Sequence, residues 1–234
     1  MLALGMIAAL AMPGTAQATP QLGDLGVKQS MSVKASNGES LEGKDLRAIQ
    51  LATYTAASVD GNTIVGYDLT TNTALASDIT AAAKAAGATD TNLTVNGKND
   101  PMVWVVKNLT DSRSDPWSGK LRNFCNSLAK QTNFAKQDGT AVSTLSQDKA
   151  TMSTGNALVP GIYAIVDRTP ATTTLSSGTA IKTTASIMMM NGTAVNGVNQ
   201  LRTAGGTTLT LGQVIYKVSN VESPDKKVNV GSAW

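Results

Sequence analysis

The sequence predicts a mainly β fold, an Ig-like β-sandwich with a helical insertion between its early and late strands. Segments rich in β-branched residues, with apolar residues at alternating positions, lie toward both ends of the chain. Alanine-rich and amphipathic segments lie between them. The 234 residues are enough to bury a core, and only 15% of them are charged and 4% aromatic. Hydroxyl and amide side chains are therefore expected to cover most of the surface.

The N-terminal residues predict a secretory signal peptide over residues 1–18. Leu2–Met12 is almost wholly apolar, Pro13-Gly14 ends the run, and Ala16-Gln17-Ala18 is a small-x-small cleavage site. Cleavage is expected between Ala18 and Thr19. The apolar run is shorter than the roughly 18 residues of a spanning helix. No positive charge precedes it, so we expect the start of the signal to be truncated.

Three strands are predicted in the first part of the mature chain. Their residues are 30–35, 45–54 and 64–69, and the first two segments carry β-branched and alternating apolar residues. Asn37-Gly38 predicts a hairpin between the first two strands, and Asp60-Gly61 predicts a turn before the third.

Helices are predicted over about residues 78–136. Residues 78–86 are alanine-rich, and each of the pairs Asp100-Pro101 and Asp115-Pro116 places an N-cap residue before a proline at the first helical position. After the second pair, four apolar residues at helical spacing predict one buried stripe: Leu121, Phe124, Cys125 and Leu128. We expect Cys125 to be a packing residue rather than a reactive thiol.

Strands return after Gly139. A buried strand is expected within Leu158–Asp167, and another over Ala185–Met190, where three methionines pack in the core and Asn191-Gly192 ends the strand. Two further strands, 207–211 and 213–218, complete a domain expected to span residues 19–222. After Pro224, the alternating residues Lys227–Val230 predict that 223–234 is a linker and the first strand of a following domain.

Composition excludes several classes of function. The chain has no histidine and one cysteine, so histidine-dependent triads, zinc sites and an intrachain disulfide are excluded. The net charge of +3 is spread along the chain without a basic cluster, which argues against nucleic acid as a partner. No motif selects a catalytic pair from the scattered Ser, Lys and Asp residues. We therefore expect a protein that is not an enzyme, with no cofactor and no metal.

Four features occur in order along the chain and carry a resemblance. They are Leu41–Tyr54, the Asp-Pro helix starts, Pro160–Asp167 and Lys217–Lys227. Together they resemble the N-terminal domain of the sortase-assembled, isopeptide-forming pilins of Gram-positive bacteria. The likeness covers essentially all of the mature chain and implies a sandwich of the pilin N-terminal type.

The resemblance implies that one lysine links successive subunits. In the family, a Tyr-Pro-Lys-Asn motif near the end of the first domain supplies a lysine that attacks the sortase thioester on the next subunit. Tyr216–Asn220 lies at the matching place, without the proline and with asparagine three residues after the lysine. Lys217 is thus the candidate linkage residue, and a solvated lysine at the strand end is the alternative. With a pKa of about 10.4, such a lysine relies on the sortase to remove its proton.

The resemblance also implies internal Lys–Asn amide bonds that form spontaneously. Burial lowers the lysine pKa, and a neighbouring acid carries protons as ammonia leaves. This domain offers an early-strand lysine, a last-strand asparagine and an acid: Lys34 or Lys44, Asn220, and Glu42 or Asp167. Lys227, or its neighbour Lys226, occupies the first-strand lysine position of the following domain. For each of these lysines, a solvated surface role is the alternative.

The expected function is that of a structural subunit, shaft or ancillary, of a sortase-assembled pilus at the cell wall. Its expected partners are other pilin subunits, and a pilus sortase and peptidoglycan through a C-terminal sorting signal. The alternative is a sortase-anchored adhesin whose sandwich binds a host protein or glycan without polymerising. A secreted enzyme is the least favoured class.

Overall fold

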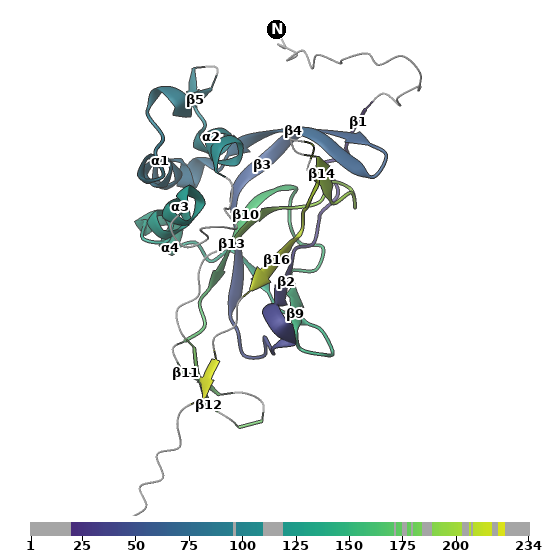
Figure 1. Ribbon diagram of the computed structural model, residues 1–234, viewed down its shortest axis with the longest axis vertical. Helices are drawn as coiled ribbons and strands as arrows, with labels where there is room; N and C mark the ends of the chain where they lie inside the picture. The colour runs from purple at the N-terminus through teal and green to yellow at the C-terminus, as the bar shows by residue number, and fades with distance from the viewer. Residues whose placement is uncertain are drawn as a thin grey trace, which may run out of the picture.

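The computed structural model is mainly β (Figure 1). It describes residues 20–95, 97–109, 119–170, 172–174, 177–178, 180–183, 189–202, 206, 208–216 and 220–222. Several predicted features lie outside these residues: the signal peptide with its cleavage site, Asp115-Pro116, residues 185–188, Lys217 and the segment 223–234.

The larger sheet has the strand order β13-β10-β3-β4-β14-β15, and β1 and β7 also pair with β3. The sheet is mixed, because β14 runs parallel to β4 while its other pairs are antiparallel. The long strand β3 is its centre. Its strands are β1 (Gln21–Leu22), β3 (Leu46–Asp60), β4 (Thr63–Thr71), β7 (Thr140–Val142), β10 (Gly161–Asp167), β13 (Met189–Gly192), β14 (Gln200–Arg202) and β15 (Thr208–Thr210).

A second sheet has the order β16-β2-β9-β8, with β16 parallel to β2. Its strands are β2 (Ser32–Ala35), β8 (Thr144–Leu145), β9 (Thr151–Ser153) and β16 (Gln213–Tyr216). Two small sheets complete the β structure: β5 (Thr94–Val95) with β6 (Lys98–Asn99), and β11 (Thr172–Thr174) with β12 (Ala180–Thr183) and β17 (Asn220–Glu222).

The helices lie between β4 and β7 in the chain and gather on one side of the molecule (Figure 1). They are α1 (Ala76–Ala85), α2 (Pro101–Asn108), α3 (Lys120–Leu128) and α4 (Thr132–Ala135), with short 3-10 turns at Ser36–Gly38, Thr73–Leu75 and Thr91–Leu93. Apolar residues of α1 to α4 pack with those of β3, β4 and β10 in the larger core cluster. Cys125 is buried in this cluster, as predicted, together with Phe124 and Leu128.

A second core cluster joins the two larger sheets. Val33 of β2 and Val214 of β16 pack with Leu46 of β3 and with Tyr163 and Ile165 of β10. The alternating neighbours Ile162 and Ala164 belong to the helix-side cluster instead. Because successive strand residues point to opposite faces, β10 carries the second sheet on one face and the helices on the other.

The hairpin predicted at Asn37-Gly38 is wrong. β2 and β3 do not pair with each other but lie in different sheets. Ser36–Gly38 is a 3-10 turn, and Leu41 in the following loop is fully buried in the second core cluster. The loop crosses between the sheets because its own apolar residue packs between them.

Asn191-Gly192 does end a strand, as predicted, but the two residues are its last members rather than a turn that follows it. Both residues belong to β13, where Gly192 lies opposite Ile162 of β10. A side chain on Gly192 would overlap the Tyr54 hydroxyl. This glycine is explained by close packing rather than by a turn.

The position of Asp100 before Pro101 predicts that its carboxylate caps α2. In the structure this carboxylate makes no direct capping hydrogen bond. It accepts hydrogen bonds from the backbone N–H and the hydroxyl of Thr71, and the Thr71 hydroxyl oxygen in turn accepts from Met102 N at 3.0 Å. The start of α2 is therefore capped through Thr71 of β4, which ties the helix to the larger sheet.

Gly161 explains the Pro160-Gly161 pair before the buried strand. A Cβ atom at this position would overlap the Ala52 carbonyl oxygen of the paired strand β3. We expect Gly161→Ala to lower the free energy of unfolding by about 3 kcal/mol, because backbone cannot move aside as a flexible side chain can. Denaturant unfolding measures the change as a lower midpoint with an unchanged slope.

Gly66→Ala in β4 is the matched control for this prediction. No atom lies within 4 Å of its added Cβ. The free energy of unfolding of the Gly66→Ala chain should stay within about 1 kcal/mol of that of the unsubstituted chain. Equal effects of the two substitutions would contradict the close approach at Gly161.

Candidate functional site

Lys44 lies at the end of a tight turn that leads into β3. Its backbone N–H donates to the Leu41 carbonyl at 3.1 Å, and Gly43 has a φ of 78°, which suits glycine. The turn directs the lysine inward, since only 6% of the residue is exposed. A lysine is rarely this buried without a partner.

Strand pairing brings Asp167 to Lys44. Asp167 ends β10 directly opposite Leu46, two residues after Lys44. The pairing continues past the ladder: the backbone N–H of Asp45 donates to the Thr169 hydroxyl at 2.8 Å, and that of Arg168 donates to the Asp45 carbonyl at 2.7 Å. Lys44 and Asp167 are therefore diagonal neighbours across two strands, within reach of a long side chain.

Tyr216 reaches the same place from the second sheet. It ends β16, and only 2% of it is exposed. The Lys44 ammonium lies 5.7 Å from the centroid of its ring, within the range of a cation–π contact. Its hydroxyl donates a hydrogen bond to Asp167 Oδ2. Lys44, Asp167 and Tyr216 thus form one cluster, which we call the lysine cluster.

The environment of the lysine cluster favours a neutral amine. Burial lowers the pKa of Lys44, and the charge of Asp167 acts in the opposite direction and raises it. The net effect is a pKa below that of a free lysine. A neutral lysine amine is a nucleophile, and an adjacent carboxylate can accept or return its proton. The cluster therefore holds two of the groups that an amide-forming reaction requires, a nucleophile and a proton carrier.

The other predicted lysine and acid have different surroundings. Lys34 is exposed on β2, between the buried residues Val33 and Ala35, so it is on the outer face of the second sheet. Glu42 forms an ion pair of 2.5 Å with Lys149. Of the paired candidates, the structure brings together Lys44 and Asp167.

The backbone of Asn220 begins β17 and lies opposite Thr183 of β12. It is four residues beyond Tyr216, so the two Cα atoms are at most about 14 Å apart. Lys217, Lys226 and Lys227 lie outside the described residues.

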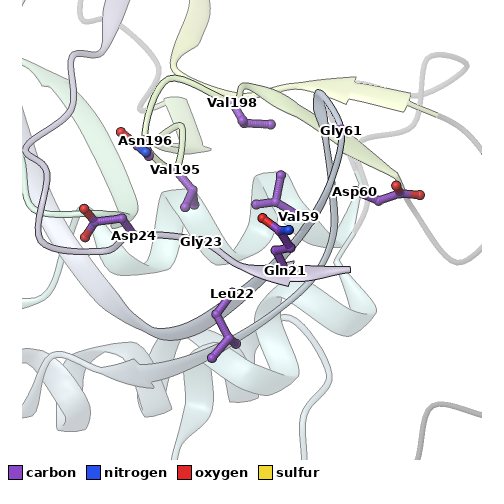
Figure 2. Close-up of a pocket in the computed structure, with 10 residues that line it drawn as sticks. All are labelled: Gln21, Leu22, Gly23, Asp24, Val59, Asp60, Gly61, Val195, Asn196 and Val198. Atoms are coloured by element: carbon purple, nitrogen blue, oxygen red, sulfur yellow. The ribbon is translucent and has the colours of Figure 1, made fainter. Parts of the chain in front are cut away.

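A separate cavity of about 430 Å³ lies between β1, the turn from β3 to β4 and the turn from Val195 to Val198. Figure 2 shows Asp24 and Asn196 toward one end and Asp60 toward the other. Its polar groups are carboxylates and amides, and its remaining lining includes the valines at 59, 195 and 198. Such a lining can donate and accept hydrogen bonds with hydroxyl groups.

Within the parts of the chain that the structure describes, no group of three metal-ligating side chains comes together. In the same residues, no helix combines the length and apolarity needed to span a membrane.

Comparison with known proteins leaves the family open. No protein-family model matches the chain, and no curated protein matches it in sequence.

Tyr216 is the member of the lysine cluster that the sequence did not indicate as a site residue. It belongs to the segment that resembles the pilin motif, but in that motif the functional residue is the lysine, which corresponds to Lys217. In the sequence, Val214, Ile215 and Tyr216 are three consecutive apolar residues, so the pattern does not show which of them face inward. The structure buries Val214 and Tyr216 and exposes Ile215.

Proposed function

We propose that the chain is a structural, non-catalytic subunit of a sortase-assembled surface pilus, with an Ig-like domain of the pilin N-terminal type. The observation that carries the proposal is the buried Lys44 beside Asp167 in a β-domain without a disulfide. A lysine in solvent costs the fold little, whereas burial of a charged amine carries a desolvation free energy that must be offset by a partner or by a reaction. An internal amide bond is the product of such a reaction, and it suits a subunit that must bear load outside the cell.

The proposed internal bond joins Lys44 Nζ to Cγ of Asn220, with Asp167 as the proton carrier. The neutral amine attacks Cγ, the new C–N bond forms, and the bond from Cγ to Nδ2 breaks. Asp167 takes a proton from Nζ and delivers one to the departing nitrogen, which leaves as ammonia. The carboxyl group returns to its starting state. The product is an amide that reductants cannot cut.

Two measurements on the unaltered protein test this function. Cell-surface extracts should show covalent ladders that persist in hot detergent and disappear when the pilus sortase gene is deleted. The purified chain should have an intact mass lower than its sequence by one ammonia. A single band in extracts of cells that keep the pilus sortase would contradict polymerisation. An intact mass equal to that of the sequence would contradict the internal bond.

The cavity beside β1 favours a second candidate, an adhesin anchored by sortase that does not polymerise. Its carboxylates and amides, with apolar valines between them, match the hydroxyls and ring hydrogens of a glycan. Both candidates predict attachment to the cell wall. Only the pilus subunit predicts ladders, so the same extracts separate the two.

A further inference from the structure

Tyr216 is held in the core by the strand on which it lies. β16 runs parallel to β2, with Tyr216 opposite Ala35, and both residues are buried in the cluster between the sheets. Ile215, the residue before it, is 56% exposed. The alternation fixes the ring inside the sandwich, facing the end of β10.

Both oxygens of Asp167 are held by hydrogen bonds from different elements. Oδ1 accepts from the backbone N–H of Thr169 at 2.8 Å, a local contact beyond β10. Oδ2 accepts from the Tyr216 hydroxyl, which comes from the other sheet. With the Thr169 hydrogen bond alone, the carboxylate group of Asp167 could still rotate. The additional hydrogen bond from Tyr216 fixes the plane of the carboxylate.

The Tyr216 ring also covers the amine. Its centroid is 5.7 Å from Lys44 Nζ. One side chain therefore contacts both the nucleophile and the proton carrier. A water molecule in the place of the ring would stabilise the charged amine and oppose the reaction.

We propose that Tyr216 is a positioning residue for the internal amide bond: its hydroxyl orients the Asp167 carboxylate toward Lys44, and its ring keeps water from the amine. This inference rests on the proposed function. Tyr216 exchanges no atoms in the reaction, which stays balanced as written above, with one amide and one ammonia as products.

The test compares Tyr216→Phe with Tyr163→Phe. Both tyrosines are buried in the same core cluster, and each substitution removes one hydroxyl. The Tyr163 hydroxyl donates to the Val159 carbonyl at 2.9 Å rather than to the lysine cluster. Each chain is produced by cell-free synthesis, and intact mass is followed over time as ammonia is lost. Urea midpoints report the stability of each variant.

We expect Tyr216→Phe to slow the loss of ammonia about tenfold or more, since it removes a hydrogen bond to a charged group. Tyr163→Phe should keep the rate of the unsubstituted chain. Equal rates in the three chains would overturn the role of Tyr216 and leave the internal bond intact. A full mass in the unsubstituted chain would overturn the bond itself, and the inference with it.

A spectroscopic measurement makes the test independent of the rate. In a Lys44→Met background the proposed bond at Lys44 cannot form, so the carboxyl carbon of Asp167 reports its hydrogen bonds in the absence of that reaction. Its NMR shift should change on adding Tyr216→Phe and stay constant on adding Tyr163→Phe. A constant shift in both would show that the hydroxyl does not hold Asp167, contrary to the inference.

Discussion

A Lys44→Met chain is expected to keep its full mass and to lose much of its stability. Methionine fills the place of the buried stem without an amine, so no amide can form at this position. By analogy with a disulfide that closes a very long loop, the proposed crosslink is expected to stabilise the fold by about 5 kcal/mol. Intact mass and denaturant unfolding measure the two effects on one sample.

Lys34→Met is the matched control for this result. Lys34 is the other early-strand candidate, but it is exposed on the outer face of β2. Its substitution should leave the loss of ammonia unchanged and alter stability by less than about 0.5 kcal/mol. Loss of ammonia in the Lys44→Met chain would mean that another lysine forms the bond.

A Lys217→Arg subunit is expected to remain a single band where the unsubstituted protein forms ladders. Arginine keeps the positive charge but stays protonated at any physiological pH, so it cannot attack a thioester. The change is all or none, because each added subunit needs the same lysine. Detergent gels of cell-surface extracts from the producing cells measure it.

Lys227→Arg separates the two proposed roles of the C-terminal lysines. Lys227 is proposed to form an internal bond in the following domain, so its substitution should leave the ladders intact. Ladders that survive Lys217→Arg and vanish with Lys227→Arg would move the linkage to the second lysine.

Much of the fold can be predicted because it depends on local patterns. Alternating apolar residues locate β3, the Asp60-Gly61 turn locates the start of β4, and a continuous apolar run locates β10. Helical spacing locates the buried face of α3 around Phe124. The choice of strand partners is not local. Asn37-Gly38 has the composition of a hairpin, yet β2 pairs with β9 and β16, and β16 is about 180 residues away along the chain. Only packing of the complete chain decides between these pairings.

The same distinction applies to the candidate site. The sequence offers Lys34 and Lys44 as equivalent early-strand lysines, because the face on which each lies depends on register. The structure separates them: Lys44 lies diagonal to Asp167, while Lys34 is on an outer face. Tyr216 could not be predicted as a neighbour of Lys44 and Asp167, because the parallel pairing of β16 with β2 is what brings Tyr216 to them.

The lysine cluster also lies next to the proposed point of assembly. Tyr216 directly precedes Lys217 in the chain, so the residue that contacts Lys44 and Asp167 ends the strand before the proposed linkage lysine. The internal bond and the bond between subunits would then share one strand. A load passed along a pilus through Lys217 would be carried into the core through β16.

The most direct test of the pilus function is tandem mass spectrometry of trypsin-digested, high-molecular-weight pili. We predict a branched peptide in which Lys217 Nζ is joined by an amide to the C-terminal residue of a cleaved sorting signal. Pili in which Lys217 is unmodified throughout would contradict it.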